Sequence, residues 1–294
     1  MNLFTKQTNA LVLTGQLRLK DNQNPIEKIN EHINYFKPDY TYLFLWDYEY
    51  ELYGEQIKQI PNSEIIIADS NKYIPTEYEM QHLILQLRKY LLPSIKRRKD
   101  KFAKSEDIKA ITNFMIVPSI KQQTFSQINF NHSNYIVSRY DIVYAEQTNK
   151  LQLEEIYQFL DSDKPTIATP YGGDAEGIGL GDLVVFANKK AAKFFTTFYD
   201  VIIQDCTKQI APSFPEGMLR YIFSNVNNAD IFRFNFPCTT QSQYENNYYI
   251  HPNVPHLNIS KNNTPIPIPK YPKLETKEYN NPAFDLPLIT NIVM

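Results

Sequence analysis

Three short apolar runs constrain the fold of this chain more than any other feature: Ala10–Thr14, Thr41–Trp46 and Glu64–Ala68. Each has the length of a β-strand, and the runs are rich in β-branched and aromatic residues, as buried strands are. A segment with the chemistry of a helix separates the first two. This alternation predicts a parallel sheet flanked by helices, because parallel neighbours need long crossover connections.

The first helix begins at a recognisable start signal. Asn24 is the expected cap, Pro25 the first helical residue and Glu27 the reciprocal capping partner. Apolar spacing predicts further helices from Tyr78, over residues 106–123, over Leu151–Leu160, over Lys189–Cys206 and from Pro215, with Pro93 and Pro118 as breaks. Later strands are expected at Thr166–Thr169, Leu183–Ala187 and Asp230–Phe234.

The end of the chain differs in composition from the rest. Residues 251–294 hold eight of the 19 prolines. Such a segment is expected to be extended, either packing on the domain or partly disordered. No linker or repeat interrupts the earlier chain. We therefore expect one α/β domain over residues 1–250, with a mixed, mainly parallel central sheet, and an irregular Pro-rich tail over residues 251–294.

Two charges interrupt an apolar run in the middle of the chain. Tyr135–Tyr144 begins as a buried strand, and Arg139 and Asp141 then project from the same face of the extended chain. Charges are expensive within a buried strand but not at its exit, where ligands bind in open α/β sheets. The alternative is an ion pair that only ties the strand end to a neighbouring loop.

A glycine-rich segment follows at Tyr171–Asp182. It contains five of the eight glycines, and Asp174, Glu176 and Asp182 lie among or beside them. A strand rather than a helix follows, so the segment is not a dinucleotide-binding fingerprint. Its composition favours a loop that closes over a ligand, and the alternative is a mobile surface loop that binds nothing.

Charge and cysteine content exclude several classes of protein. The net charge of −2 argues against a nucleic-acid-binding protein. Cys206 and Cys238 are too few for a disulfide framework and are typical of a reducing compartment. No signal peptide or membrane span is expected, so a cytoplasmic location is predicted. The basic cluster Lys96–Lys101 is interpreted as a solvated helix face, with contact to phosphates or to an anionic inner-membrane surface as the alternative.

Several motifs together resemble a family of bacterial glycosyltransferase-like proteins from surface-polysaccharide loci, of the capsule and lipopolysaccharide-core type. Their order along the chain also agrees with that family. The motifs are Leu11–Arg18, similar to the "SGQxR" opening, Tyr42–Asp47, similar to the second strand, Ile136–Asp141, similar to the "xxxRxD" strand, Gly181–Phe186, similar to the "GDxxxxG" segment, and Phe214–Glu216, similar to the "PE" element.

The resemblance implies a GT-A-type, Rossmann-like fold and transfer of a sugar from a nucleotide-sugar donor to a glycan or lipid-linked glycan acceptor. It places Gly15, Gln16 and Arg18 near the nucleotide, and Arg139 and Asp141 near the diphosphate. Many GT-A enzymes hold Mn²⁺ or Mg²⁺ with an Asp-x-Asp pair. Here Arg139 replaces one acid, so Asp141 is the one expected metal ligand and metal dependence is left open. Without a metal, Arg139 would neutralise the diphosphate.

Glu216 and Asp182 are the candidate catalytic carboxylates. Glu216 begins a helix whose dipole favours the ionised form, and Asp182 closes the glycine-rich segment. Asp174, Glu176 and a retaining mechanism without a protein base remain open. So do two other functions: a noncatalytic protein that binds nucleotide sugars or glycans on the same scaffold, and a sugar nucleotidyltransferase, which would need a richer glycine loop after the first strand.

Overall fold

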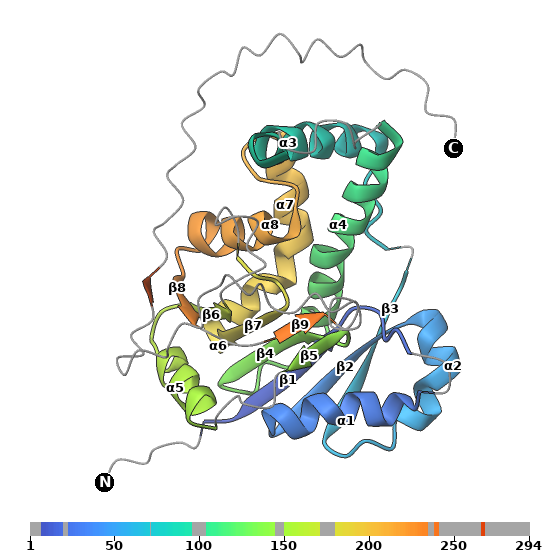
Figure 1. Ribbon diagram of the computed structural model, residues 1–294, viewed down its shortest axis with the longest axis vertical. Coiled ribbons are helices and arrows are strands. Elements are labelled where there is room, and N and C mark those ends of the chain that lie inside the picture. Colours follow the sequence, from blue (N-terminus) through green and yellow to red (C-terminus); the bar gives the residue numbers. More distant parts are fainter. Residues whose placement is uncertain are drawn as a thin grey trace.

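The computed structural model describes residues 7–19, 23–70, 72–95, 104–144, 150–170, 180–234, 238–240 and 266–267 (Figure 1). Its strands are β1 (Asn9–Thr14), β2 (Tyr40–Trp46), β3 (Ser63–Ala68), β4 (Asn134–Arg139), β5 (Ile142–Tyr144), β6 (Thr166–Pro170), β7 (Val184–Asn188), β8 (Asp230–Phe234), β9 (Cys238–Thr240) and β10 (Ile266–Pro267). Its helices are α1 (Pro25–Phe36), α2 (Asp47–Ile57), α3 (Glu77–Ile95), α4 (Lys104–Phe125), α5 (Lys150–Leu160), α6 (Lys189–Ala192), α7 (Phe198–Thr207) and α8 (Pro215–Tyr221).

A mixed sheet of eight strands forms the centre, in the order β10-β8-β6-β7-β4-β1-β2-β3. β3, β2, β1 and β4 are parallel to one another. β7 is antiparallel to both β4 and β6, whereas β6 and β8 pair in parallel. The predicted single α/β domain with a mixed, mainly parallel sheet is therefore confirmed. β10, from the Pro-rich tail, pairs antiparallel with β8, and β5 pairs with β9 in a separate two-stranded sheet.

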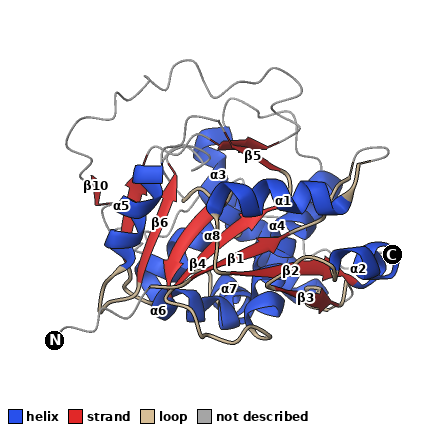
Figure 2. Cartoon of the chain, turned by 90° about the horizontal axis from the view of Figure 1, so that it is seen from below, coloured by secondary structure: helices blue, strands red, loops and turns tan. Residues whose placement is uncertain are grey.

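Alternate residues of the central strands pack on two helical layers. Leu11 and Leu13 of β1 belong to a core completed by α1, α2 and α5. Ala10 and Val12 point the other way, into a core completed by α3, α4, α6, α7 and α8. Figure 2 shows the sheet between these layers, with α1 on one side and α6 and α7 on the other. Because strand side chains alternate between faces, the nearly continuous apolar runs follow from burial on both faces.

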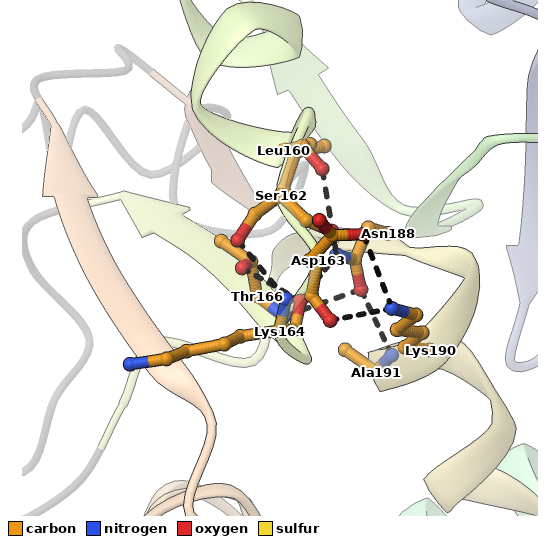
Figure 3. A network of polar contacts seen from close by, with 8 residues as sticks. All are labelled: Leu160, Ser162, Asp163, Lys164, Thr166, Asn188, Lys190 and Ala191. Atoms are coloured by element: carbon orange, nitrogen blue, oxygen red, sulfur yellow. Dashed lines mark hydrogen bonds and ion pairs between the residues drawn. The ribbon is translucent and has the colours of Figure 1, made fainter.

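Asn188 connects several segments at the end of the sheet where β6 begins and β7 ends (Figure 3). Its Oδ1 accepts from Thr166 N at 3.2 Å and from Ala191 N at 2.9 Å, the second bond capping α6. Its Nδ2 lies within hydrogen-bond distance of three carbonyl oxygens, those of Leu160, Ser162 and Lys164. Lys190 adds contacts to Asp163 at the surface. This cluster joins α5, β6, β7 and α6.

Several helix predictions need correction. α3 continues past Pro93, and α4 runs through Pro118 without ending. The helix expected over Lys189–Cys206 is divided into α6, a 3₁₀ turn (Lys193–Thr197) and α7. α2 was not predicted, because its tyrosines and acids lack a clear apolar period. Asn24 caps α1 as expected, accepting from Ile26 N at 2.9 Å.

Three predicted segments lie wholly or largely outside the described residues. They are the basic cluster Lys96–Lys101, the glycine-rich segment up to residue 179, and the tail apart from β10. The boundary at residues 250 and 251 therefore stays a prediction. In the part of the chain that the structure describes, no helix has both the length and the apolarity needed to cross a membrane.

Candidate functional site

The sheet topology gathers three chain segments at the carboxyl end of β4. Parallel pairing sets Arg139 of β4 opposite Thr14 of β1, so the loop that leaves β1 lies beside it. Antiparallel pairing sets Ser138 opposite Val184, so Asp182 arrives at the same place from the start of β7. A reversed strand thus delivers the residues before it, not those after it, to this edge of the sheet.

Arg139 and Asp141 form a bidentate ion pair across the turn between β4 and β5. Arg139 Nε donates to Asp141 Oδ1 at 2.9 Å, and Nη2 donates to Oδ2 at 2.6 Å. Arg18 Nη1 adds a third contact to Asp141 Oδ2 at 3.3 Å. The Asp141 side chain is 8% exposed and the Arg139 side chain 29% exposed, so part of the Arg139 side chain remains accessible.

Gly15 begins the loop after β1 with an open backbone. Its φ of +88° lies in the left-handed region, which glycine adopts without strain, and no heavy atom lies within 4 Å of where a Cβ would be. Arg18 also has a positive φ, of 43°. Gln16 is exposed, and its side chain is hydrogen-bonded to Tyr48. The loop therefore presents backbone and one arginine next to Asp141.

Glu49 of α2 holds this loop in place by a backbone hydrogen bond, a role that was not predicted from the sequence. Its Oε1 accepts from Leu17 N at 2.8 Å and its Oε2 accepts from Trp46 N at 3.2 Å. Burial raises the pKa of Glu49, although the two backbone hydrogen bonds act to lower it. The sequence signal was an acid in the first turn of a helix directly after a strand, but α2 was not recognised.

Asp182 and Glu216 lie within electrostatic reach of Arg139. Asp182 is 8% exposed, and the backbone of Glu216 accepts from Leu180 N at 2.9 Å, which links α8 to the end of the glycine-rich segment. Burial acts to lower the pKa of Arg139, but Asp141, Asp182 and Glu216 together raise it above its ordinary value. Asp174 and Glu176 lie outside the described residues.

A buried hydrogen-bond chain supports the turn that carries Asp141. His32 Nε2 donates to the carbonyl oxygen of Tyr140 at 3.2 Å, and Tyr144 Oη donates to His32 Nδ1 at 2.8 Å. Ser138 Oγ then donates to Tyr144 Oη at 2.7 Å. A carbonyl can only accept, which fixes the neutral tautomer of His32. Burial lowers the pKa of His32 to about 4.

Lys121 of α4 is a further charged residue near Arg139 and was not predicted. It is buried, and it lies within electrostatic reach of Asp182 and Arg139. The available signal was a lysine on an apolar helix face. Because a break was predicted at Pro118, the apolar face was not followed as far as Lys121.

The donor set around Asp141 does not fit a divalent cation. Both carboxylate oxygens already accept hydrogen bonds from guanidinium groups, and Mg²⁺ or Mn²⁺ needs several free oxygen ligands. Among the described residues, no three His, Cys, Asp or Glu side chains come together in a way that could hold a metal ion. Asp141 is therefore held by arginines and is not free to serve as a metal ligand.

The structure thus brings some of the predicted site residues into contact, but not all of them. Arg18, Arg139 and Asp141 are in direct contact, and Asp182 and Glu216 act on Arg139 through their charges. Gly15 lies beside them through the pairing of β1 with β4, whereas the Gln16 side chain is turned to Tyr48.

Comparison with known proteins gives distant structural likenesses. The sequence matches no protein-family model and no curated protein. A 4-diphosphocytidyl-2C-methyl-D-erythritol synthase from Anaerococcus prevotii is similar at a TM-score of 0.41 and 7% identity, with 77% of this chain and 89% of that chain covered. Mouse xyloside xylosyltransferase 1 is similar at a TM-score of 0.35 and 11% identity, with 76% and 84% covered.

HddC from Yersinia pseudotuberculosis is similar at a TM-score of 0.38 and 11% identity, with 82% of this chain and 96% of that chain covered. At these scores and identities, the likenesses support no conclusion about activity.

Proposed function

We propose that this protein is a glycosyltransferase with a GT-A-type fold, which moves a sugar from a nucleotide-sugar donor to a glycan acceptor in surface-polysaccharide biosynthesis. The observation that carries the proposal is the partly exposed side chain of Arg139, whose guanidinium is oriented by Asp141 at the carboxyl end of a central strand. Ligands of open α/β sheets bind at this edge. The motif resemblance supplies the donor class and the biological setting.

The geometry of Arg139 suits a diphosphate. Guanidinium groups pair with phosphate oxygens through several parallel hydrogen bonds, and Asp141 fixes the plane of this one. Arg18, with a 57% exposed side chain, offers a second cation from the loop after β1. The open backbone at Gly15 would let the nucleotide approach closely.

Glu216 and Asp182 are the candidates for the general base of an inverting reaction. The acceptor hydroxyl oxygen would form a bond to the anomeric carbon while the bond from that carbon to the diphosphate breaks. The hydroxyl proton would pass to the carboxylate, and the bonding electron pair would leave with the diphosphate. We favour Glu216, because it is only partly buried, whereas Asp182 is 8% exposed and less open to an acceptor.

A screen of nucleotide sugars, with thermal unfolding as the readout, tests donor binding. A donor at a hundred times its dissociation constant should stabilise the folded state by about 2.7 kcal/mol. The hits are then incubated with glycan acceptors, and released nucleoside diphosphate is measured with EDTA or with Mn²⁺. If no nucleotide sugar stabilises the protein, the proposed donor class is wrong.

A noncatalytic binding protein is the second candidate. One observation favours it: Arg139 and Asp141 satisfy each other, as a purely structural ion pair would. Such a protein would be stabilised by a nucleotide sugar or a glycan without releasing nucleoside diphosphate. A sugar nucleotidyltransferase would instead release pyrophosphate from a nucleoside triphosphate and a sugar phosphate, so one assay for each product separates the three functions.

A further inference from the structure

Helix α4 buries an ammonium group on the side that faces the sheet. Lys121 is 3% exposed. It lies one helical turn before Phe125, whose ring packs against Tyr135 of β4 with 6.2 Å between the ring centroids. Lysine is almost never buried to this extent unless a counter-charge or several hydrogen-bond acceptors compensate for lost water.

The ammonium group of Lys121 makes no hydrogen bond or ion pair with the residues that the structure describes. Its neighbours on α4 are also buried, but they are satisfied. Gln122 donates to Asp200 Oδ2 at 2.8 Å, and Gln123 accepts from Asp69 N at 3.2 Å. The ammonium of Lys121 thus differs from the neighbouring buried polar side chains on α4, which do form hydrogen bonds.

The charges around Lys121 do not compensate for the free-energy cost of burying its ammonium group. Burial is the main influence and lowers the pKa of Lys121 to about 8, Asp182 acts to raise it, and Arg139 acts to lower it. At neutral pH most of the population still carries the charge. Two cations therefore lie near each other at the end of β4, and Asp141 is already engaged by arginines. A bound anion would relieve both the burial and the repulsion.

We propose that Lys121 and Arg139 together bind the diphosphate of the donor, where many enzymes of this chemistry would use a divalent cation. The identity of the anion rests on the proposed function, whereas the site itself rests on the buried ammonium without a partner. Lys121 provides a compact charge and Arg139 a planar one. When the sugar leaves, negative charge grows on the diphosphate oxygen, and both cations stabilise it in a site that needs no reorganisation.

Titration calorimetry with inorganic pyrophosphate in EDTA tests the site on the full chain. Lys121→Met keeps the length of the side chain and removes its charge, and Lys121→Gln is a second variant. Lys109→Met is the matched control, because Lys109 lies on the same helix but is exposed. We expect wild type to bind pyrophosphate, both Lys121 variants to bind at least tenfold more weakly, and Lys109→Met to stay within twofold.

Thermal unfolding of the free proteins separates a ligand-binding role from a structural one. A lysine held for an anion costs stability while the site is empty, so Lys121→Met should unfold at the same temperature as wild type or higher. Any of three results would overturn the inference. The first is a Lys121 variant that binds pyrophosphate within threefold of wild type. The second is a wild type that binds pyrophosphate only with added Mg²⁺, and the third is a fall in unfolding temperature in both Lys121 variants.

Donor assays distinguish this inference from the proposed function. A protein that binds pyrophosphate through Lys121 but neither binds nor consumes a nucleotide sugar would keep the anion site and lose the glycosyltransferase assignment. If instead sugar transfer proceeds with unchanged kcat and KM after Lys121→Met, the enzyme assignment stands and the role of Lys121 is wrong.

Discussion

Tyr144 Oη and His32 Nδ1 lie 2.8 Å apart in the chain of hydrogen bonds that supports the turn at Asp141. The hydroxyl donates, so the imidazole must be neutral, and its other nitrogen donates to the carbonyl of Tyr140. Protonation of His32 would add a hydrogen to Nδ1, so that this N–H donor would face the O–H donor of Tyr144. The conformation of the Arg139–Asp141 turn is therefore tied to the ionisation of a residue on α1.

Acidification should destabilise the protein through His32. Its pKa is lowered to about 4 in the folded state, against an ordinary value near 6.5, so the unfolded chain binds more protons between these values. Stability contributed by neutral His32 is fully present above pH 6.5 and is lost as pH falls through this window. The loss should total about 3 kcal/mol. Urea unfolding at pH 7 and pH 4.5 measures it, and the His32→Gln variant should lack this part of the pH dependence.

Arg139→Gln should weaken binding of a nucleoside diphosphate by about 1.5–3 kcal/mol, the scale of a hydrogen bond to a charged group. It should also destabilise the fold, because buried Asp141 loses the shorter of its two described arginine contacts and keeps the longer one from Arg18. The double variant Arg139→Gln, Asp141→Asn should recover stability but not binding. Calorimetry and urea unfolding measure the two effects. Equal affinity in wild type and Arg139→Gln would exclude Arg139 from the donor site.

Glu216→Gln should lower turnover by about 10²–10⁴-fold with little change in donor affinity, because it removes a proton acceptor and keeps the shape. Asp182→Asn is the comparison, since Asp182 lies within electrostatic reach of the same arginine. Transfer rates under saturating donor measure both. If Glu216→Gln stays within threefold of wild type while Asp182→Asn loses activity, the role of the base belongs to Asp182.

Asn188→Ala should destabilise the fold by about 2–4 kcal/mol, because it leaves buried backbone groups of three segments without partners. Donor binding should not change, because register sets Asn188 opposite Asn134, at the far end of β4 from Arg139. Lys190→Ala is the control, and loss of its exposed ion pair with Asp163 should cost about 0–1 kcal/mol. If the folded Asn188→Ala variant binds the donor more weakly than wild type, the two ends of β4 are not independent and this prediction is wrong.

The sequence predicted those parts of the fold that depend on local patterns. The apolar runs at β1, β2 and β3 and the cap at Asn24 agree with the structure, because burial on both faces and helix capping leave local signals. The pairing of β4 with β7 was not predictable in this way. Strand order depends on contacts between distant segments, and an antiparallel strand inside a parallel sheet has no signature of its own.

The candidate site was predictable to a similar extent. Arg139 and Asp141 stood out because charge within an apolar run is rare, but their two-residue spacing did not reveal that they bind each other. Lys121 and Glu49 were missed. Their roles arise from tertiary burial and from backbone groups of other segments, and neither is visible in the residues beside them.

The position of β1 between β2 and β4 has a consequence during synthesis. β1 and β2 can pair as soon as residue 46 has left the ribosome, but the other edge of β1 must wait for β4, more than 80 residues later. During that interval an apolar strand presents unpaired backbone groups to other nascent chains. Pairing between such distant segments slows folding, and strand edges left open in the meantime favour aggregation.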